Sequence, residues 1–362
     1  MIQTYSSTIR RKEMEAVLTC MVDEKIGPGD MNVKLIQTIK DVTGCDGAVA
    51  LRSPSLALEY ALKALDLPKD SLILLSALAP AWQIVTVEKN GYKPYVLDVS
   101  EENGLVTLNA VEEGVKAGGR LIILTESMGV LPDIQKIISF GIPVIEDISQ
   151  SAFSYFPKEM SETETQETSV EENATEEKGK RAGMYGVFSI LGMEETDIIT
   201  SGGGAVLIAP GRREWIVLKR IMETALPTDI MPDMNAALAN VEIKEFSRNE
   251  ESRRELYSLF SRAISSGRHK TYVRANDDGS TIYSFPVVLN SGFRDVKAFA
   301  QKKGIEIRQA YENSIIALRQ EELSSKCICA NSLLLRCALF PLYPRLGKKE
   351  AEQIIRVLAS LP

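Results

Sequence analysis

Residues 47–76, GAVALRSPSLALEYALKALDLPKDSLILLS, decide the fold of this chain. The middle of the stretch predicts an amphipathic helix, because Leu56, Tyr60, Leu62 and Leu65 recur at helical spacing. The PKD triplet ends that helix, and the apolar run that follows predicts a buried strand. A short apolar segment, a helix and a second short apolar segment indicate a parallel sheet covered by helices.

The same alternation continues on the C-terminal side. Helices are predicted at 82–91, 108–118 and 132–141, and strands at 93–99, 120–127 and 142–149. In such α/β folds, ligands bind beyond the carboxyl ends of the strands. These ends are predicted at Ser53 and at residues 76–80, 125–128 and 147–150.

Residues 158–181 interrupt the alternation with a glutamate-rich segment that has little apolar content and no period. This composition predicts a solvated, mobile insertion or an extended loop. Two short β segments follow, at 183–191 and 202–210. The triple glycine 202–204 permits unusual backbone conformations, but it lacks the fingerprint of a dinucleotide site or a P-loop.

The C-terminal part predicts a smaller α+β domain. A long helix over 235–265 is followed by a strand at 283–289, a helix at 294–304, a strand or loop at 305–311 and a final helix from 348. We therefore expect a large domain over residues 1–240, carrying the insertion at 158–181, and a small domain over residues 241–362.

Composition excludes several classes of function. The net charge of −7 argues against nucleic acid or an anionic membrane as the main partner, since both require basic surface. No apolar run approaches the roughly 18 residues of a membrane span. Five cysteines, an odd and low count, predict a reduced, cytoplasmic setting and no metal site. The single histidine, His269, lies among polar residues and is expected to be exposed, which leaves little for a histidine-based mechanism.

Several segments resemble the DegT/StrS-type sugar aminotransferases, which are pyridoxal-phosphate (PLP) enzymes of fold type I, the class of aspartate aminotransferase. The resemblance rests on the order and spacing of AVALRSPSLALEYALKAL (48–65), GYKPYVLDVSEENGLV (91–106), ESMGVLPDIQKI (126–137), PVIEDISQS (143–151), SGGGAVLI (201–208), MNAALANVEIKEF (234–246), RRELYSLF (253–260) and LFPLYPRL (339–346). It implies a PLP-transferase-like large domain with a mainly parallel sheet and a smaller C-terminal domain.

The resemblance assigns five residues to cofactor binding. Asp147 matches the aspartate that pairs with the pyridine nitrogen of PLP, and Gln150 matches a glutamine beside the ring oxygen. Ser53 and Ser55 flank the position where the family binds the phosphate at a helix start. Trp82 lies two residues after the position of a stacked aromatic ring and is either a cover for the pocket or a core residue. Asp147 is alternatively a strand-end aspartate that accepts hydrogen bonds from backbone N–H groups.

Other positions depart from the family pattern. Pro54 stands between the two serines and removes one backbone N–H donor. Glu126 replaces a histidine or similar polar residue, where an acid facing a phosphate would be unfavourable. Residues 228–230, Thr-Asp-Ile, stand where the family has an Asn-Tyr-Arg stretch that reaches the neighbouring subunit.

The largest departure is the Schiff-base lysine. The chain has no lysine between Lys180 and Lys219, and the matching position falls at Thr196, with Glu194, Glu195 and Asp197 as alternatives. None of these side chains carries the amine that a Schiff base requires.

These departures predict a degenerate member of the family, with weak or no transaminase activity, that acts as a binding or regulatory subunit in sugar or polysaccharide biosynthesis. The alternative is an enzyme that uses PLP or its aminated form, PMP, on a 4-keto nucleotide sugar without the lysine. Noncovalent PLP and no cofactor at all are both compatible with these residues. The resemblance further implies a nucleotide-sugar-type ligand and a homodimer, or a heterodimer with an active relative.

Overall fold

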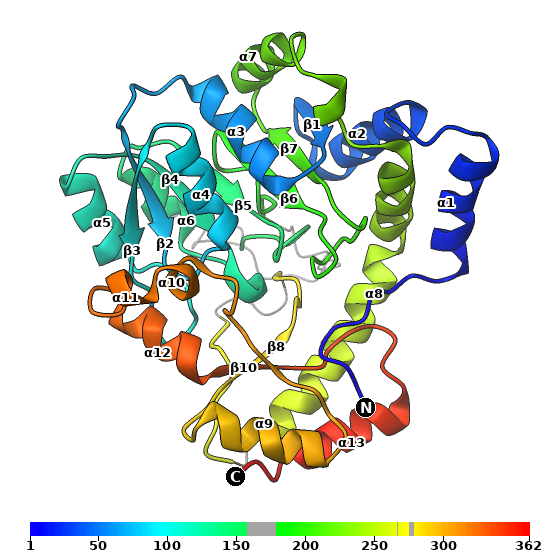
Figure 1. Ribbon diagram of the computed structural model, residues 1–362, viewed down its shortest axis with the longest axis vertical. Helices are drawn as coiled ribbons and strands as arrows, with labels where there is room; N and C mark the ends of the chain where they lie inside the picture. Colours follow the sequence, from blue (N-terminus) through cyan, green and yellow to red (C-terminus); the bar gives the residue numbers. More distant parts are fainter. Residues whose placement is uncertain (158–178, 266, 275–278) are drawn as a thin grey trace, which may run out of the picture.

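The computed structural model describes residues 1–157, 179–265, 267–274 and 279–362. The predicted glutamate-rich insertion therefore lies almost entirely outside the described residues. Within them, one large sheet and one small sheet are joined by a long helix, α8 (Figure 1).

In the described residues the large sheet has seven strands, in the order β1-β7-β6-β5-β4-β2-β3. All neighbouring strands are parallel except those paired with β7, which runs antiparallel to β1 and to β6. The predicted mainly parallel sheet is thus confirmed. Its strands are β1 (Gly47–Leu51), β2 (Leu72–Ser76), β3 (Lys93–Leu97), β4 (Gly119–Thr125), β5 (Val144–Asp147), β6 (Phe188–Gly192) and β7 (Ala205–Ala209).

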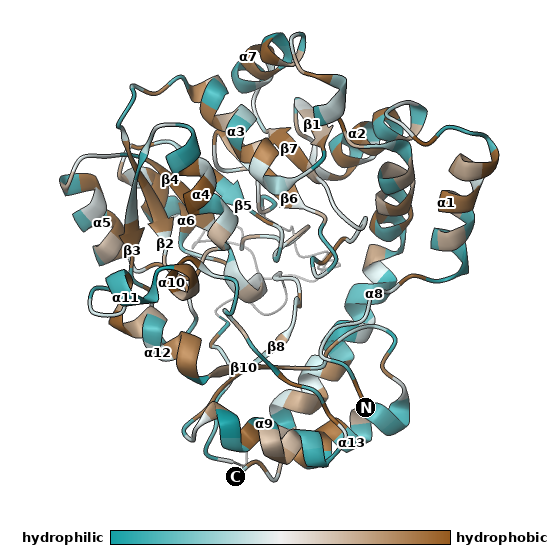
Figure 2. Ribbon diagram, viewed as in Figure 1, coloured by the Kyte–Doolittle hydropathy of each residue, from teal (hydrophilic) through white to brown (hydrophobic). Residues whose placement is uncertain are grey.

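Helices cover both faces of this sheet, because successive strand residues point to opposite sides. Ile73 and Leu75 pack into one hydrophobic core, whereas Leu74 between them packs into the other. Figure 2 shows the hydrophobic residues of strands such as β2 and β4 in brown. The helices of this part are α1 (Arg11–Val22), α2 (Asp30–Thr43), α3 (Pro54–Leu65), α4 (Ala81–Lys89), α5 (Leu108–Lys116), α6 (Ile134–Ser139) and α7 (Arg212–Met222), with short 3₁₀ turns at Ser127–Gly129 and Pro227–Asp229.

The long helix α8 (Asp233–Ser265) begins beside the large sheet and ends in the smaller, third core. There it packs with a three-stranded sheet in the order β8-β10-β9, which confirms the predicted small α+β part. The remaining elements are β8 (Phe285–Val288), α9 (Phe293–Lys302), β9 (Arg308–Gln309), α10 (Ile315–Leu318), α11 (Gln320–Leu323), α12 (Ile328–Arg336), β10 (Cys337–Phe340) and α13 (Lys348–Leu358).

The N-terminal segment connects the two parts a second time. It runs beside α8, from α1 down to the small sheet (Figure 1). Ile2 forms a parallel bridge with Ile305, and the Thr8 hydroxyl donates to the Glu242 carboxylate on α8 at 3.2 Å. This path brings residues 4–8 next to the carboxyl ends of the large sheet's strands, where the candidate site lies.

Candidate functional site

A cavity of about 320 Å³ opens beyond the carboxyl ends of β4 and β5. Its walls come from the loop before α4, the ends of the two strands, the turn between β6 and β7, and residues 308–314. The position agrees with the strand ends predicted from sequence, because ligands of α/β sheets bind at that edge. Of the residues assigned to cofactor binding, Asp147, Gln150 and Trp82 line this cavity.

Asp147 lies at the base of the cavity and is 2% exposed. Its Oδ2 accepts a hydrogen bond from Gln83 Nε2 at 2.7 Å, and its Oδ1 accepts from the Ser149 hydroxyl at 2.6 Å and from the Ser149 backbone N–H at 3.2 Å. Burial raises the pKa of Asp147, and the hydrogen bonds from Ser149 and Gln83 oppose the rise. Asp147 thus accepts the backbone N–H hydrogen bond expected of an aspartate at a strand end. The role of Asp147 toward a pyridine nitrogen stays a prediction.

Gln83 is a partner of Asp147 that sequence reasoning missed. It is fully buried on α4, and its amide also contacts Thr125 at 2.9 Å. The available signal was an amide at a helix position whose neighbours Ile84 and Val87 are core residues. Gln83 therefore orients the Asp147 carboxylate from the opposite side to Ser149.

Gln150 supports a strained turn at the cavity wall. Its Oε1 accepts a hydrogen bond from the Met128 backbone N–H at 2.7 Å, and Met128 has a left-handed φ of 56°. A left-handed conformation is costly for a residue with a side chain, so the turn depends on such contacts. The cofactor role inferred for Gln150 stays a prediction.

The residues at the start of α3 cap this helix. Ser53 is the N-cap and its hydroxyl accepts from the Leu56 N–H at 3.2 Å, while Pro54 is the first helical residue. The Ser53 and Ser55 hydroxyls also contact each other at 3.0 Å. Pro54 reaches the cavity wall, whereas neither serine does. Pro54 has no backbone N–H, and the Ser53 hydroxyl occupies the N–H of Leu56. This helix start therefore has fewer free N–H donors for a phosphate than a helix start with no cap and no proline.

Trp82 lies in the cavity wall, and its role toward a cofactor stays a prediction. It lines the cavity and also packs, partly buried, against the hydrophobic core on that face of the sheet. Pro80, at the position of the family's stacked aromatic ring, lines the cavity as well.

The acidic turn between β6 and β7 places one carboxylate at the base of the cavity. Glu194, Glu195 and Thr196 are exposed, whereas Asp197 is partly buried. A Cβ on Gly192 would lie 2.6 Å from Ser149 Oγ and 2.7 Å from Asp197 Oδ2, so Asp197 sits next to the serine that holds Asp147. Burial and the charges of Asp147 and Glu194 raise the pKa of Asp197 to about 8.

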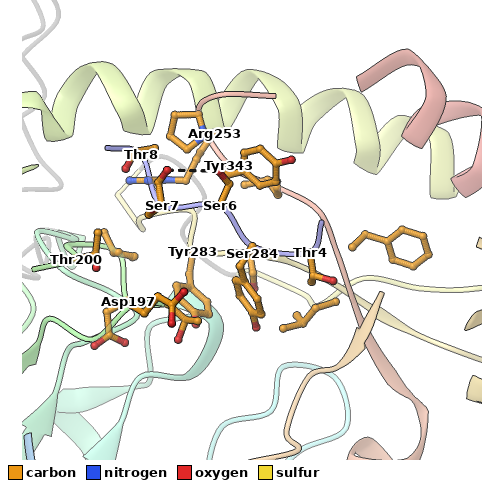
Figure 3. Close-up of a pocket in the computed structure, with 18 residues that line it drawn as sticks. Thr4, Ser6, Ser7, Thr8, Asp197, Thr200, Arg253, Tyr283, Ser284 and Tyr343 are labelled. Carbon is orange, nitrogen blue, oxygen red and sulfur yellow. Dashed lines mark hydrogen bonds between the residues drawn. The ribbon is translucent and has the colours of Figure 1, made fainter. Parts of the chain in front are cut away.

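The other members of this turn lie further out. Glu194 and Thr196 contribute to the cavity wall, and Glu195 lines only a neighbouring pocket of about 50 Å³. Figure 3 shows that pocket, with Asp197 and Tyr283 on one side and Arg253 and Thr8 on the other. Thr196, Asp197, Tyr283 and Tyr5 are shared by the two hollows.

Several wall residues carried no usable signal in the sequence. Tyr5 comes from the N-terminal segment, and Arg308, Tyr311 and Glu312 come from the segment that begins at β9. Arg308 is the only basic residue among the described residues of the cavity wall, and it lies 3.3 Å from Glu306 and 4.0 Å from Glu312. Tyr5 reaches the site along the path of the N-terminal segment, and the other three residues reach it through the packing of the small sheet.

Glu126 corrects one expectation. It does not line the described cavity wall but is fully buried, with Oε2 hydrogen-bonded to the Ser151 hydroxyl. Burial and the neighbouring Glu146 raise the pKa of Glu126 well above its usual range. Glu126 therefore does not face a ligand in the cavity, and its raised pKa favours the neutral form, so the expectation of an acid facing a phosphate was wrong.

Residues 228–230 lie at the edge of the large sheet. Asp229 accepts the Tyr60 hydroxyl at 2.7 Å, and Ile230 bridges to Leu51 at the end of β1. These contacts are made within the chain, to α3 and β1.

His269 was expected to be exposed, and this was wrong. Its side chain is 4% exposed, with Nδ1 accepting from the Asn290 N–H at 3.1 Å and Nε2 lying 3.1 Å from the Pro362 carbonyl oxygen. The reason is the pairing of Lys270 with Val288, which turns the adjacent histidine inward. His269 does not line the cavity.

The described residues contain no group of three or more His, Cys, Asp or Glu side chains that could hold a metal ion. Across the same residues, no helix combines the length and the apolar character that crossing a bilayer requires.

PLP fits this cavity poorly. The described wall contains no lysine, the helix start offers a capped serine and a proline, and the one arginine is flanked by carboxylates. Asp147 and Gln150 both line the cavity, and their predicted roles beside the pyridine ring stay predictions. The residues present therefore do not match a lysine-bound, phosphate-bearing cofactor.

Solved structures share the fold over their whole length. The aminotransferase TlmJ from Streptoalloteichus hindustanus superposes with a TM-score of 0.85 at 15% identity, covering 99% of this chain and 98% of that one. An aminotransferase from Psychrobacter cryohalolentis gives 0.82 at 16%, with 98% of each chain covered. The E. coli GDP-4-keto-6-deoxy-D-mannose-3-dehydratase with bound hydrated PLP gives 0.82 at 14%, with 99% of each chain covered.

At these identities the structures establish the fold alone, and the sequence profile carries the family assignment. The profile of the DegT/DnrJ/EryC1/StrS aminotransferase family matches residues 7–217 and 228–359, nearly the whole chain. The resemblance read from the sequence segments is thereby confirmed, and the chain belongs to the DegT/DnrJ/EryC1/StrS aminotransferase family.

Proposed function

We propose that this chain is a DegT-type nucleotide-sugar aminotransferase homologue with weak or no transaminase activity. It acts as a binding or regulatory subunit in sugar or polysaccharide biosynthesis. The observation that carries the proposal is the cavity wall itself, where Asp197, Glu194 and Thr196 lie at the turn expected to hold the Schiff-base lysine. A carboxylate cannot form the covalent link of that chemistry.

The direct test is the absorbance of the protein purified with added PLP, followed by an assay for transamination of a 4-keto nucleotide sugar. We expect no internal-aldimine band and no turnover. Thr196→Lys and Asp197→Lys are the informative variants, and Glu352→Lys on the exposed face of α13 is the matched control. An aldimine band or turnover in the unmodified protein would overturn the proposal.

A second candidate function is a PLP- or PMP-dependent enzyme that acts on a 4-keto nucleotide sugar without the lysine. The observation favouring it is that Asp147 and Gln150 both line the cavity. The same experiment separates the two candidates, because turnover with a cofactor that dialysis removes would support the second.

The proposal includes pairing with a second copy of this chain or with an active relative. Four apolar side chains of α1, Met14, Leu18, Met21 and Val22, are between 51% and 79% exposed, which is compatible with a partner subunit. Light scattering of the purified chain measures self-pairing, and co-purification from the native source shows whether a lysine-bearing relative accompanies it. A strictly monomeric chain that recovers no relative would contradict this part.

A further inference from the structure

A small pocket next to the main cavity contains a buried arginine to which the proposed function assigns no role. The pocket has a volume of about 50 Å³ and lies where the N-terminal segment, α8, the turn between β6 and β7 and the end of β10 meet. Figure 3 shows Arg253 on one side of the pocket with Thr8, and Asp197 and Tyr283 on the other. Arg253 comes from α8 and is only 5% exposed.

The hydrogen bonds of Arg253 are incomplete. Its Nε donates to Glu250 Oε2 at 3.2 Å, but its buried Nη2 has no hydrogen-bond partner in the part of the chain that the structure describes. A guanidinium group carries five N–H donors, and a buried donor of a charged group is costly when it has no acceptor. The surroundings of Arg253 therefore lack an acceptor.

The charge of Arg253 is also only partly offset. Glu250 divides its contacts between Arg253, Arg254 and the backbone N–H of Ile282. Glu242 interacts with Arg253 as well, but burial and the nearby Glu13 raise the pKa of Glu242 to about 7, so this acid is only partly ionised near neutral pH. Burial lowers the pKa of Arg253, because its surroundings do not replace all of the hydration that the cation has lost.

The pocket wall suits a small anion. Arg253 is the only basic residue among the described wall residues, and Ser7, Thr200 and Tyr343 bring hydroxyl groups that can donate hydrogen bonds. A volume of about 50 Å³ exceeds the roughly 30 Å³ that one water occupies. It is far below the roughly 300 Å³ at which pockets for organic ligands begin. The space therefore admits a small ion and excludes a sugar or a nucleotide.

The two acids of the wall oppose an anion only weakly near neutral pH. Burial and the charges of Asp147 and Glu194 raise the pKa of Asp197 to about 8, so its neutral form is favoured there. Glu195 is exposed, and water and salt screen its charge. Arg253 thus supplies the strongest local charge of the described wall, which favours a ligand with a single negative charge.

We propose that this pocket binds one monovalent inorganic anion of the size of chloride, held against the Arg253 guanidinium and the hydroxyl groups of the wall. The site is separate from the main cavity and does not depend on whether the chain transaminates. A bound anion would join the N-terminal segment and the turn between β6 and β7 to α8. Because the wall exists only in the folded chain, the anion would stabilise that state by mass action.

The first test compares thermal and urea unfolding of the full chain in sodium chloride and in sodium gluconate at equal ionic strength. Gluconate has the same charge as chloride but is too large for the pocket. A site with a Kd of about 10 mM should shift the folding equilibrium roughly tenfold toward the folded state at about 100 mM chloride. Crystals grown in sodium bromide should show an anomalous peak in the pocket, in contact with the Arg253 guanidinium.

Two variants locate the anion. Arg253→Gln should lose the roughly tenfold chloride shift, whereas Arg262→Gln, at an exposed position on the same helix, should keep it. Ser7→Glu leaves Arg253 and its contact with Glu250 in place and adds a carboxylate to the pocket wall. This carboxylate should compete with chloride and remove the shift. Circular dichroism confirms that the variants are folded.

The control for the added charge is Ser360→Glu, at an exposed position after α13, which should keep the chloride shift. Where Arg253→Gln does not fold, the comparison of Ser7→Glu with Ser360→Glu decides the question.

Four results would overturn the proposal: equal stability in chloride and gluconate, a chloride shift that Ser7→Glu retains, an equal loss of the shift in the control variants, or a bromide crystal with only water in the pocket. An aldimine band or transamination would contradict the proposed function and leave this anion site unaffected.

Discussion

Glu126→Gln should make the stability of this protein less dependent on pH. Glu126 and Glu146 are both fully buried, and burial raises the pKa of each. The Glu146 carboxylate accepts backbone N–H groups from Gly183, Tyr185 and Gly186, with distances of 2.9, 2.8 and 2.5 Å, and so is better suited to carry the negative charge. Glu126 Oε1 has no hydrogen-bond partner among the described residues, so the pair is best satisfied when Glu126 carries a proton.

The magnitude follows from linkage. A carboxyl with a raised folded-state pKa contributes stability that is fully present below the ordinary glutamate pKa and is lost as the pH rises toward the folded pKa. One proton held only by the folded state costs about 1.4 kcal/mol of unfolding free energy per pH unit in that window. Glutamine has nearly the same shape and needs no proton, so the variant should lack this slope.

The assay is urea unfolding of wild type and variant at several pH values between about 5.5 and about 7.5, where the gap in unfolding free energy should widen in favour of the variant by up to about 1.4 kcal/mol per pH unit. Glu352→Gln, which removes an exposed carboxylate, should run parallel to wild type. Parallel curves for Glu126→Gln would refute the reasoning, because they would mean that the buried pair does not hold the extra proton.

Three further changes test other parts of the site. Ser53→Ala should lower the unfolding free energy by about 1 kcal/mol, because the hydroxyl that caps α3 is lost, and Ser53→Thr should recover most of it in the same urea titration. Gly192→Ala should lower the melting temperature and shift the NMR signals of the Ser149 and Asp197 region, since a Cβ would lie 2.6 Å from Ser149 Oγ; an unchanged melting temperature would contradict the packing. Asp197→Asn should stabilise the protein progressively from about pH 5 to about pH 8. The Asp197 carboxyl has a pKa of about 8 in the folded protein and near 3.9 in the unfolded chain, so the wild-type protein loses stability as the pH rises through that range. A constant difference in unfolding free energy between variant and wild type would refute the raised pKa.

The sequence predicted the parts of the site that lie at strand ends. Asp147 is the last residue of β5 and Gln150 follows in the next turn, and the edge they occupy is a consequence of parallel strand direction. An amide among core residues of a helix indicates that Gln83 has a buried partner, but only the structure shows that this partner is Asp147. Arg308 and Tyr5 could not be predicted at all, because they reach the cavity from the small domain and from the N-terminal segment.

The sequence by itself determined the alternation of strands and helices and the absence of a lysine between residues 180 and 219. Both are local properties, since hydrophobic periodicity depends on neighbouring residues and an amine is either present or absent. The tertiary structure alone decided that Asp197 faces the cavity while Glu195 does not, and that Glu126 is buried beside Glu146. The physical reason is that burial and charge repulsion depend on distances between residues far apart in the chain, and these distances exist only once the sheet and the turn above it have packed.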